Sequence, residues 1–173
     1  NKFFFFFLVK DIADVPFGYA VKKLEDVKKI KNIAYPVIVK LNSEGSSMGL
    51  SEKSIVNNYK ELEKQVQWLL EKYNRNIIVE EYIEGIDISM AYIEGLGALG
   101  PCKVACDAKF YDYEMKTIKD KTVDITPIKD EYKDLKDIVI KIAKRLDIKG
   151  YAKLDFRVKN NKYYLIEVNS QVS

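Results

Sequence analysis

Two carboxylates and an amide are grouped near the C-terminal end of the sequence. The stretch YYLIEVNS places Glu167 and Asn169 two residues apart in a predicted strand, so both side chains project from one face of a sheet. Asp155 lies on the preceding strand, and an odd-numbered hairpin loop around Asn160 would bring it to that face. Such oxygen ligands suit Mg²⁺. The alternative is that all three are ordinary solvent-facing strand residues.

A loop rich in small residues indicates a second kind of chemistry. The stretch KLNSEGSSMGL begins at Lys40, directly after the apolar run YPVIV. Backbone N–H groups of such a loop bind anions, and Lys40 adds a positive charge. The spacing is neither that of a Walker loop nor that of a dinucleotide-binding loop. By itself the loop could equally be a simple turn.

The composition excludes several classes of mechanism. The sequence contains no histidine, which rules out catalytic triads and most zinc sites. The 29 basic and 26 acidic residues are spread along the chain, so we expect neither nucleic acid nor a membrane as a partner. Cys102 and Cys106 have no further metal-binding neighbours, and we expect a reducing, cytoplasmic location.

The order of hydrophobic patterns predicts an α+β protein. The start, NKFFFFFLVKDIAD, is too short to span a bilayer and lacks a signal-peptide cleavage site, so its apolar face is expected to be buried. Helices are predicted over residues 2–13, 24–33, 54–73 and 130–147. Strands are predicted over residues 17–21, 37–41, 76–83, 83–93, 102–111, 151–158 and 162–170. These form two blocks joined near residues 80–87, which favours two α+β lobes with a cleft between them.

Four sequence blocks, taken in order, resemble the D-alanine–D-alanine ligases and their relatives in the ATP-grasp superfamily. The blocks are YPVIVKLNSEGSSMG, VEEYIEGID, FYDYEMK, and LDF with LIEVN. The resemblance implies an ATP-grasp fold, with two α+β lobes, mainly antiparallel sheets and a nucleotide cleft between the lobes. It assigns about residues 14–83 to the small lobe and about 84–173 to the larger one. The N-terminal substrate lobe and the C-terminal tail of the family are expected to be absent from this stretch.

The resemblance assigns nucleotide-binding roles to Lys2 and to residues of the first and second blocks. Lys40 matches the lysine on the ATP phosphates, and Lys2 matches another nucleotide-binding lysine. The flexible loop over the phosphates corresponds to Gly45, Ser46, Ser47 and Gly49. The hinge that receives adenine, largely through backbone groups, corresponds to Glu80, Glu81, Tyr82 and Ile83.

Residues of the second, third and fourth blocks would contact the ribose, the γ-phosphate and the metal, respectively. Asp87 lies where the family usually has a glutamate that binds the ribose. Lys116 matches the lysine on the γ-phosphate, and Ser46 helps to hold the loop over the substrate. By resemblance, the ligands of two Mg²⁺ ions, which Mn²⁺ could replace, are Asp155, Glu167 and Asn169.

The implied reaction joins two amino-acid substrates. ATP phosphorylates a carboxylate to an acylphosphate, an amine attacks it, and an amide, ADP and phosphate result. Lysines, Mg²⁺ and backbone N–H groups suffice for phosphoryl transfer, so the missing histidine is no obstacle. Members of this family are usually homodimers, act in the cytoplasm and make cell-wall precursors.

The sequence also departs from the family pattern. Lys153 replaces an arginine that contacts the reacting carboxyl groups, and lysine lacks its bidentate fork. Thr117 and the ending NSQVS replace residues that help to select and bind the second substrate. The alternatives are a nucleotide-binding module without turnover, in which case the isolated stretch is inactive, or a divergent ATP-grasp ligase for another amino acid or a peptide.

Overall fold

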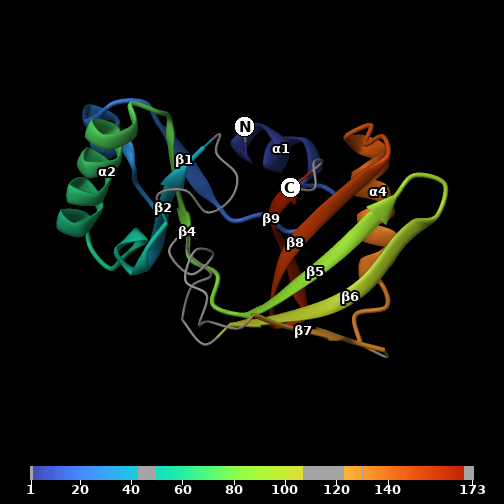
Figure 1. Cartoon of the computed structure of the whole chain (residues 1–173). Helices are drawn as coiled ribbons and strands as arrows, with labels where there is room; N and C mark the ends of the chain where they lie inside the picture. The colour runs from blue at the N-terminus through green and yellow to red at the C-terminus, as the bar shows by residue number, and fades with distance from the viewer. Residues whose placement is uncertain (1, 43–49, 107–122, 130, 170–173) are drawn as a thin grey trace. The chain divides into compact units, whose positions relative to one another are not determined.

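The chain folds as two units, and each unit is built around its own sheet (Figure 1). The computed structural model describes residues 2–42, 50–106, 123–129 and 131–169. The first unit is centred on Pro16–Tyr82, and the second combines Phe4–Val15, Ile83–Ala105 and Val123–Ser173. Within the described part of the chain, no helix is long and apolar enough to cross a membrane.

The first unit contains a four-stranded sheet with the strand order β1-β4-β2-β3. Its strands are β1 (Gly18–Val21), β2 (Val37–Leu41), β3 (Ile55–Val56) and β4 (Ile77–Glu81). Every neighbouring pair is antiparallel. The β-branched runs that predicted strands over 37–41 and 76–83 therefore form the two central strands, β2 and β4.

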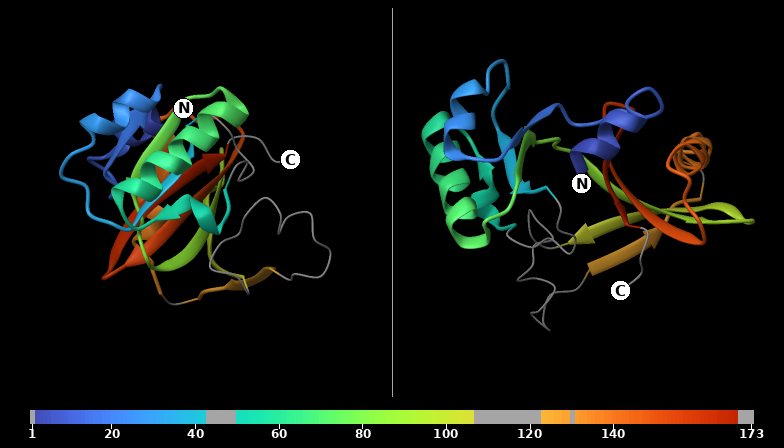
Figure 2. Two further views of the ribbon diagram at one scale, coloured as in Figure 1. Left: turned by 90° about the vertical axis from the view of Figure 1, so that its left-hand side faces the viewer. Right: turned by 90° about the horizontal axis from the view of Figure 1, so that it is seen from above.

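Helix α2 (Tyr59–Tyr73) covers one face of this sheet (Figure 2). Leu62, Val66 and Leu69 are fully buried against the apolar side chains of the strands. The prediction placed the helix start at residue 54, five residues too early. Residues 55–56 instead pair with β2, and the Asn58 side chain caps the helix by accepting a 3.0 Å hydrogen bond from the Glu61 N–H.

The helix predicted over residues 24–33 is a short 3₁₀ helix, η1 (Leu24–Lys29). Asp26 holds its first turn, because its carboxylate accepts hydrogen bonds from Lys29 Nζ (2.8 Å) and from the N–H groups of Lys22 (3.1 Å) and Lys23 (3.2 Å). These bonds lower the pKa of Asp26 to about 2, with the Lys29 bond the largest cause.

The second unit contains a five-stranded sheet with the order β7-β6-β5-β8-β9. Its strands are β5 (Ile86–Ile93), β6 (Gly97–Cys106), β7 (Val123–Pro127), β8 (Tyr151–Lys159) and β9 (Lys162–Asn169). Strand β7 was not predicted, although VDITP alternates apolar and polar residues, because it is a short edge strand that ends in a proline. Strand β6 begins at Gly97, five residues before its predicted start at residue 102.

Two helices belong to the remainder of the fold, α1 (Lys2–Val9) and α4 (Leu135–Arg145). Both are shorter than predicted. Helix α4 packs on the second sheet through buried residues such as Leu135, Val139 and Ile142. Arg145 at its end binds both oxygens of Asp11 (2.9 and 3.0 Å) and the carbonyl of Leu8 (2.9 Å), so α4 anchors the segment that follows α1.

Candidate functional site

Strands β8 and β9 bring the predicted metal ligands together. Asp155 and Glu167 are direct partners in the antiparallel register, and Lys153 faces Asn169. Directly opposed residues have Cβ atoms about 4.5–5.5 Å apart, so the four side chains form one cluster on one face of the sheet. This face is opposite to the one that buries Leu154 and Phe156.

The hairpin reaches this arrangement in a different way from the one predicted. Lys159 pairs with Lys162, so the loop has only two residues, Asn160 and Asn161, both with positive φ. An even loop would place Asp155 opposite Ile166. Instead the register shifts between Asp155 and Phe156, and Ile166 is the extra residue of a β-bulge. The bulge, and not an odd-numbered loop, places Glu167 opposite Asp155.

Asp155 is held by two neighbouring side chains. Ser89 on β5, its direct partner on the other side, donates a hydrogen bond from Oγ to Asp155 Oδ1. Lys153 Nζ lies 2.9 Å from Asp155 Oδ2. Burial alone would lower the pKa of Lys153, but the carboxylates of Asp155 and Glu167 outweigh it and the pKa is raised. Lys153 therefore stays protonated beside the two acids.

The donor set fits a hard divalent cation. Asn169 donates from Nδ2 to Glu167 Oε2 at 3.2 Å, and this bond leaves its amide oxygen free to act as a ligand. Nowhere in the described ranges do three or more His, Cys, Asp and Glu side chains form a group that could hold a metal, so this cluster depends on the Asn169 amide for its third ligand. Two carboxylates and one amide are the partial oxygen shell that Mg²⁺ uses together with phosphate and water.

In the first unit, Lys40 and Glu80 form a buried ion pair. Lys40 Nζ contacts Glu80 Oε1 across strands β2 and β4, and the two residues are only 4% and 2% exposed. The second carboxylate oxygen, Glu80 Oε2, is buried and accepts no hydrogen bond from the described residues. An unpaired buried acceptor is costly, so this oxygen is ready to receive a ligand N–H.

Two other residues of the predicted hinge, Glu81 and Tyr82, already form hydrogen bonds within the first unit. The N–H groups of Glu81 and Tyr82 donate to the carbonyls of Phe17 (2.9 Å) and Pro36 (3.1 Å). The Glu81 carboxylate accepts a hydrogen bond from the Phe17 N–H at 3.2 Å. The N–H groups of Glu81 and Tyr82 therefore already have partners, and the side chain of Glu80 offers a further acceptor. The assignment of this hinge to adenine stays a prediction.

Asp87, the predicted ribose ligand, is held by an arginine. Arg157 on the neighbouring strand donates from Nε and Nη2 to the two oxygens of Asp87 (2.7 and 2.9 Å), and from Nη1 to the carbonyl of Ile83 (3.0 Å). The Asp87 side chain remains 47% exposed. A carboxylate has about four acceptor positions, so this one can still receive hydroxyl groups.

Of the remaining predicted site residues, Lys2 lies in the described part of the chain and five others do not. Lys2 is the first residue of α1. The residues that fall outside the described ranges are Gly45, Ser46, Ser47, Gly49 and Lys116. Their assignments stay predictions.

Ser89 and Arg157 were missed by the sequence reasoning. Each lies directly across a strand pair from a predicted ligand, Asp155 or Asp87. Only the register between β5 and β8 identifies these two residues, because it places each of them opposite a predicted ligand.

The chain was compared with known families and proteins. The family model described as "D-ala D-ala ligase C-terminus" matches residues 13–171. A D-alanine–D-alanine ligase from Aquifex aeolicus is 38% identical over 139 residues, which is 79% of this chain and 46% of the relative. This chain spans about half the length of the curated relatives it matches.

Solved structures agree with the fold. The VanG D-Ala:D-Ser ligase from Enterococcus faecalis aligns with a TM-score of 0.77 at 23% identity, covering 98% of this chain and 51% of that one. A Bacillus anthracis D-alanine–D-alanine ligase complexed with ATP aligns with a TM-score of 0.73 at 19% identity, covering 98% and 54%. The predicted ATP-grasp fold is confirmed. The family model that matches residues 13–171 establishes that the chain belongs to the family of D-alanine–D-alanine ligase C-terminal domains.

Proposed function

We propose that the protein containing this chain is an ATP-dependent carboxylate–amine ligase that joins two amino acids, of which at least one is D-alanine. The pairing of Asp155 with Glu167 beside Asn169 carries this proposal, because it supplies a ligand set for the cation that accompanies ATP. The relatives that match along most of the chain are named D-alanine–D-alanine ligases, which supports the same reaction. The reaction would consume ATP and yield an amide, ADP and phosphate, by way of an acylphosphate, in the cytoplasm.

The base, the ribose and the phosphates would be bound by residues of both units. The Glu80 Oε2 acceptor suits the exocyclic amine of adenine, and its ion pair fixes the direction of the Lys40 ammonium. Ile83 would contribute backbone groups, and Asp87, held by Arg157, would accept the ribose hydroxyls. We assign the phosphates also to Lys2, to Lys116 and to the loop around Ser46.

In the second unit, the metal would be held by Asp155, Glu167 and Asn169, with Mg²⁺ as the expected ion and two ions as the expected number. When bound, the cation neutralises phosphate charge during the transfer. Ser89 would keep Asp155 in place through its hydrogen bond. Lys153 would turn from Asp155 toward the reacting carboxyl group of the substrate, to which its charge is complementary.

The direct test is phosphate release by the full-length protein. We expect release that requires ATP, a divalent cation and D-alanine together, and that yields the dipeptide in equal amount. Other amino acids are offered singly and in pairs to identify the acceptor. ATP binding without phosphate release under any of these conditions would favour the second reading, a nucleotide-binding module without turnover.

Lys153 offers a separate prediction. Replacing Lys153 with Met removes a cation 2.9 Å from a proposed metal ligand. We therefore expect the Kd for the divalent cation to fall, by about threefold to tenfold for an interaction of about 1 kcal/mol at this partly exposed site. Turnover should fall at the same time, because the substrate carboxylate loses its partner.

Calorimetric titration of the metal and steady-state kinetics measure the two effects, and Lys153→Arg is the charge-preserving control. Weaker metal binding in Lys153→Met, or unchanged turnover, would contradict the proposed role.

A further inference from the structure

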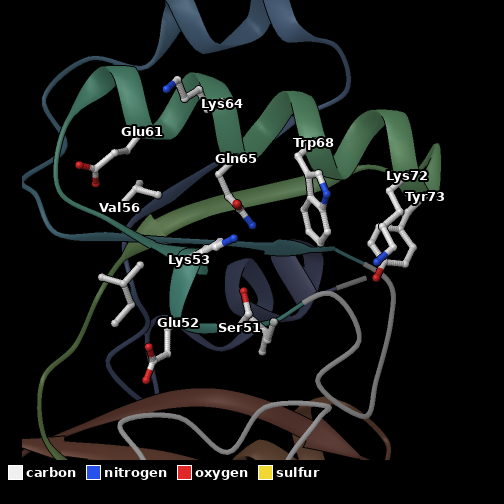
Figure 3. A pocket seen from close by; sticks show the side chains of 12 residues that line it. Ser51, Glu52, Lys53, Val56, Glu61, Lys64, Gln65, Trp68, Lys72 and Tyr73 are labelled. Carbon is white, nitrogen blue, oxygen red and sulfur yellow. The ribbon is translucent and has the colours of Figure 1, made fainter.

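A pocket lies on the α2 side of the first unit, and none of the residues that line it is assigned above to ATP or metal. It has a volume of about 920 Å³ and is formed by α2, β3 and the short 3₁₀ helix η2 (Glu52–Ser54), together with Leu50 and Ser51 (Figure 3). We call it the α2–β3 pocket. All its lining residues belong to one unit, so its shape does not depend on how the two units are arranged.

Gln65 gives the pocket an unsatisfied donor. This residue of α2 is only 8% exposed, and its Nε2 is buried with no hydrogen-bond partner among the described residues. Its side chain extends from the helix into the pocket (Figure 3). A buried amide N–H without an acceptor costs folding free energy, and a ligand oxygen at this position would remove that cost.

The charges around Gln65 favour an anion. Lys53 of η2 extends into the same part of the pocket, and no ion pair of its ammonium group is found within the described ranges (Figure 3). Of the two lining carboxylates, Glu61 is already occupied, since it accepts hydrogen bonds from the Asn57 N–H (2.8 Å) and from Asn58 Nδ2 (2.7 Å). The other carboxylate, that of Glu52, extends away from Gln65 and Lys53 (Figure 3). Two donors, an amide and an ammonium, therefore lie together in one region of the pocket.

The remaining wall is apolar. It is lined by Leu50, Ile55, Val56 and Trp68. Trp68 is 40% exposed, and the Lys72 ammonium lies 4.8 Å from the centroid of its ring. A cavity of this size and lining is much larger than a free phosphate needs, and it suits a ligand with an apolar body and one polar end.

We propose that the α2–β3 pocket binds a small amphipathic carboxylate. The carboxylate accepts hydrogen bonds from Gln65 Nε2 and Lys53 Nζ, and the apolar or aromatic body packs against Trp68. This binding is separate from the proposed ligase reaction, because it uses none of the residues assigned to that reaction.

Trp68 makes the proposal directly testable, because it is the only tryptophan in the 173 residues. Phenylacetate is titrated into the protein while tryptophan emission is recorded with selective excitation. We expect a saturable change in emission, and a Kd about tenfold higher for the neutral analogue phenylacetamide, since the amide lacks the charge that Lys53 pairs with. Inorganic phosphate is expected not to compete.

Two variants locate the carboxylate. Gln65→Leu and Lys53→Met should each raise the Kd for phenylacetate by about tenfold, whereas Lys60→Met, a change of an exposed lysine outside the pocket, should leave it unchanged. Lys53 is exposed, so its variant is expected to fold normally even if Gln65→Leu alters packing. The proposal is overturned if emission does not saturate, if phenylacetamide binds as well as phenylacetate, if phosphate competes, or if Lys53→Met binds normally.

Discussion

Replacing Glu167 with Gln is expected to reduce phosphate release by about a hundredfold, which corresponds to about 3 kcal/mol of lost transition-state stabilisation. The variant keeps the size of the side chain but loses the charge that pairs with the cation opposite Asp155. ATP binding should be largely kept, because Lys40, Glu80 and Asp87 are unchanged. The measurements are the rate of phosphate release and the Kd for ATP.

A matched control is Glu25→Gln, which removes the same charge from an exposed residue of η1. We expect its phosphate release to equal that of the unaltered protein. If Glu167→Gln kept full activity at limiting metal concentration, Glu167 would not be a metal ligand. If both the rate and ATP binding were lost, the substitution would have disturbed the sheet, and urea unfolding would reveal this.

The second large effect concerns the buried pair of Lys40 and Glu80. Replacing Lys40 with Met leaves the Glu80 carboxylate, only 2% exposed, without its cation. Removing one partner of a buried ion pair typically costs about 3–5 kcal/mol, because the other charge stays buried and uncompensated. We expect the free energy of unfolding, measured with urea, to fall by about that amount.

The double variant Lys40→Met with Glu80→Gln should recover a large part of this loss, because it removes both charges together. Lys60→Met, at an exposed position of α2, serves as the control and should change the unfolding free energy by less than about 0.5 kcal/mol. A loss below about 1 kcal/mol in the single variant, or a double variant less stable than the single one, would contradict the account of this pair.

The long periodic segments were predictable because their local pattern and their tertiary burial agree. In α2, the spacing of Leu62, Val66 and Leu69 indicated the buried face, and the β-branched residues of 37–41 indicated a central strand. The start of α2 was predicted too early because pairing of residues 55–56 with β2 overrides the helical periodicity. Local propensity carries no information about such a partner.

The metal-ligand set was predictable as a group, but its geometry was not. Spacing alone placed Glu167 and Asn169 on one face, whereas the bulge at Ile166 depends on how β8 and β9 meet and left no sign in the sequence. Ser89, Arg157 and the buried carboxylate of Glu80 became relevant only through contacts across strands. Local residue patterns do not specify which distant strands pair, so these contacts could not be predicted from them.

The central claim, that this chain binds ATP together with a divalent cation, is tested most directly by its thermal midpoint. The midpoint is measured with ATP and Mg²⁺, with ATP and EDTA, and with Mg²⁺ alone. Ligand at about a hundred times its Kd stabilises a fold by about 2.7 kcal/mol, so we predict a rise of about 5 °C when ATP and Mg²⁺ are both present, and a much smaller rise with either alone. An unchanged midpoint with both would contradict the claim, and an equal rise with ATP and EDTA would contradict the role of Asp155, Glu167 and Asn169.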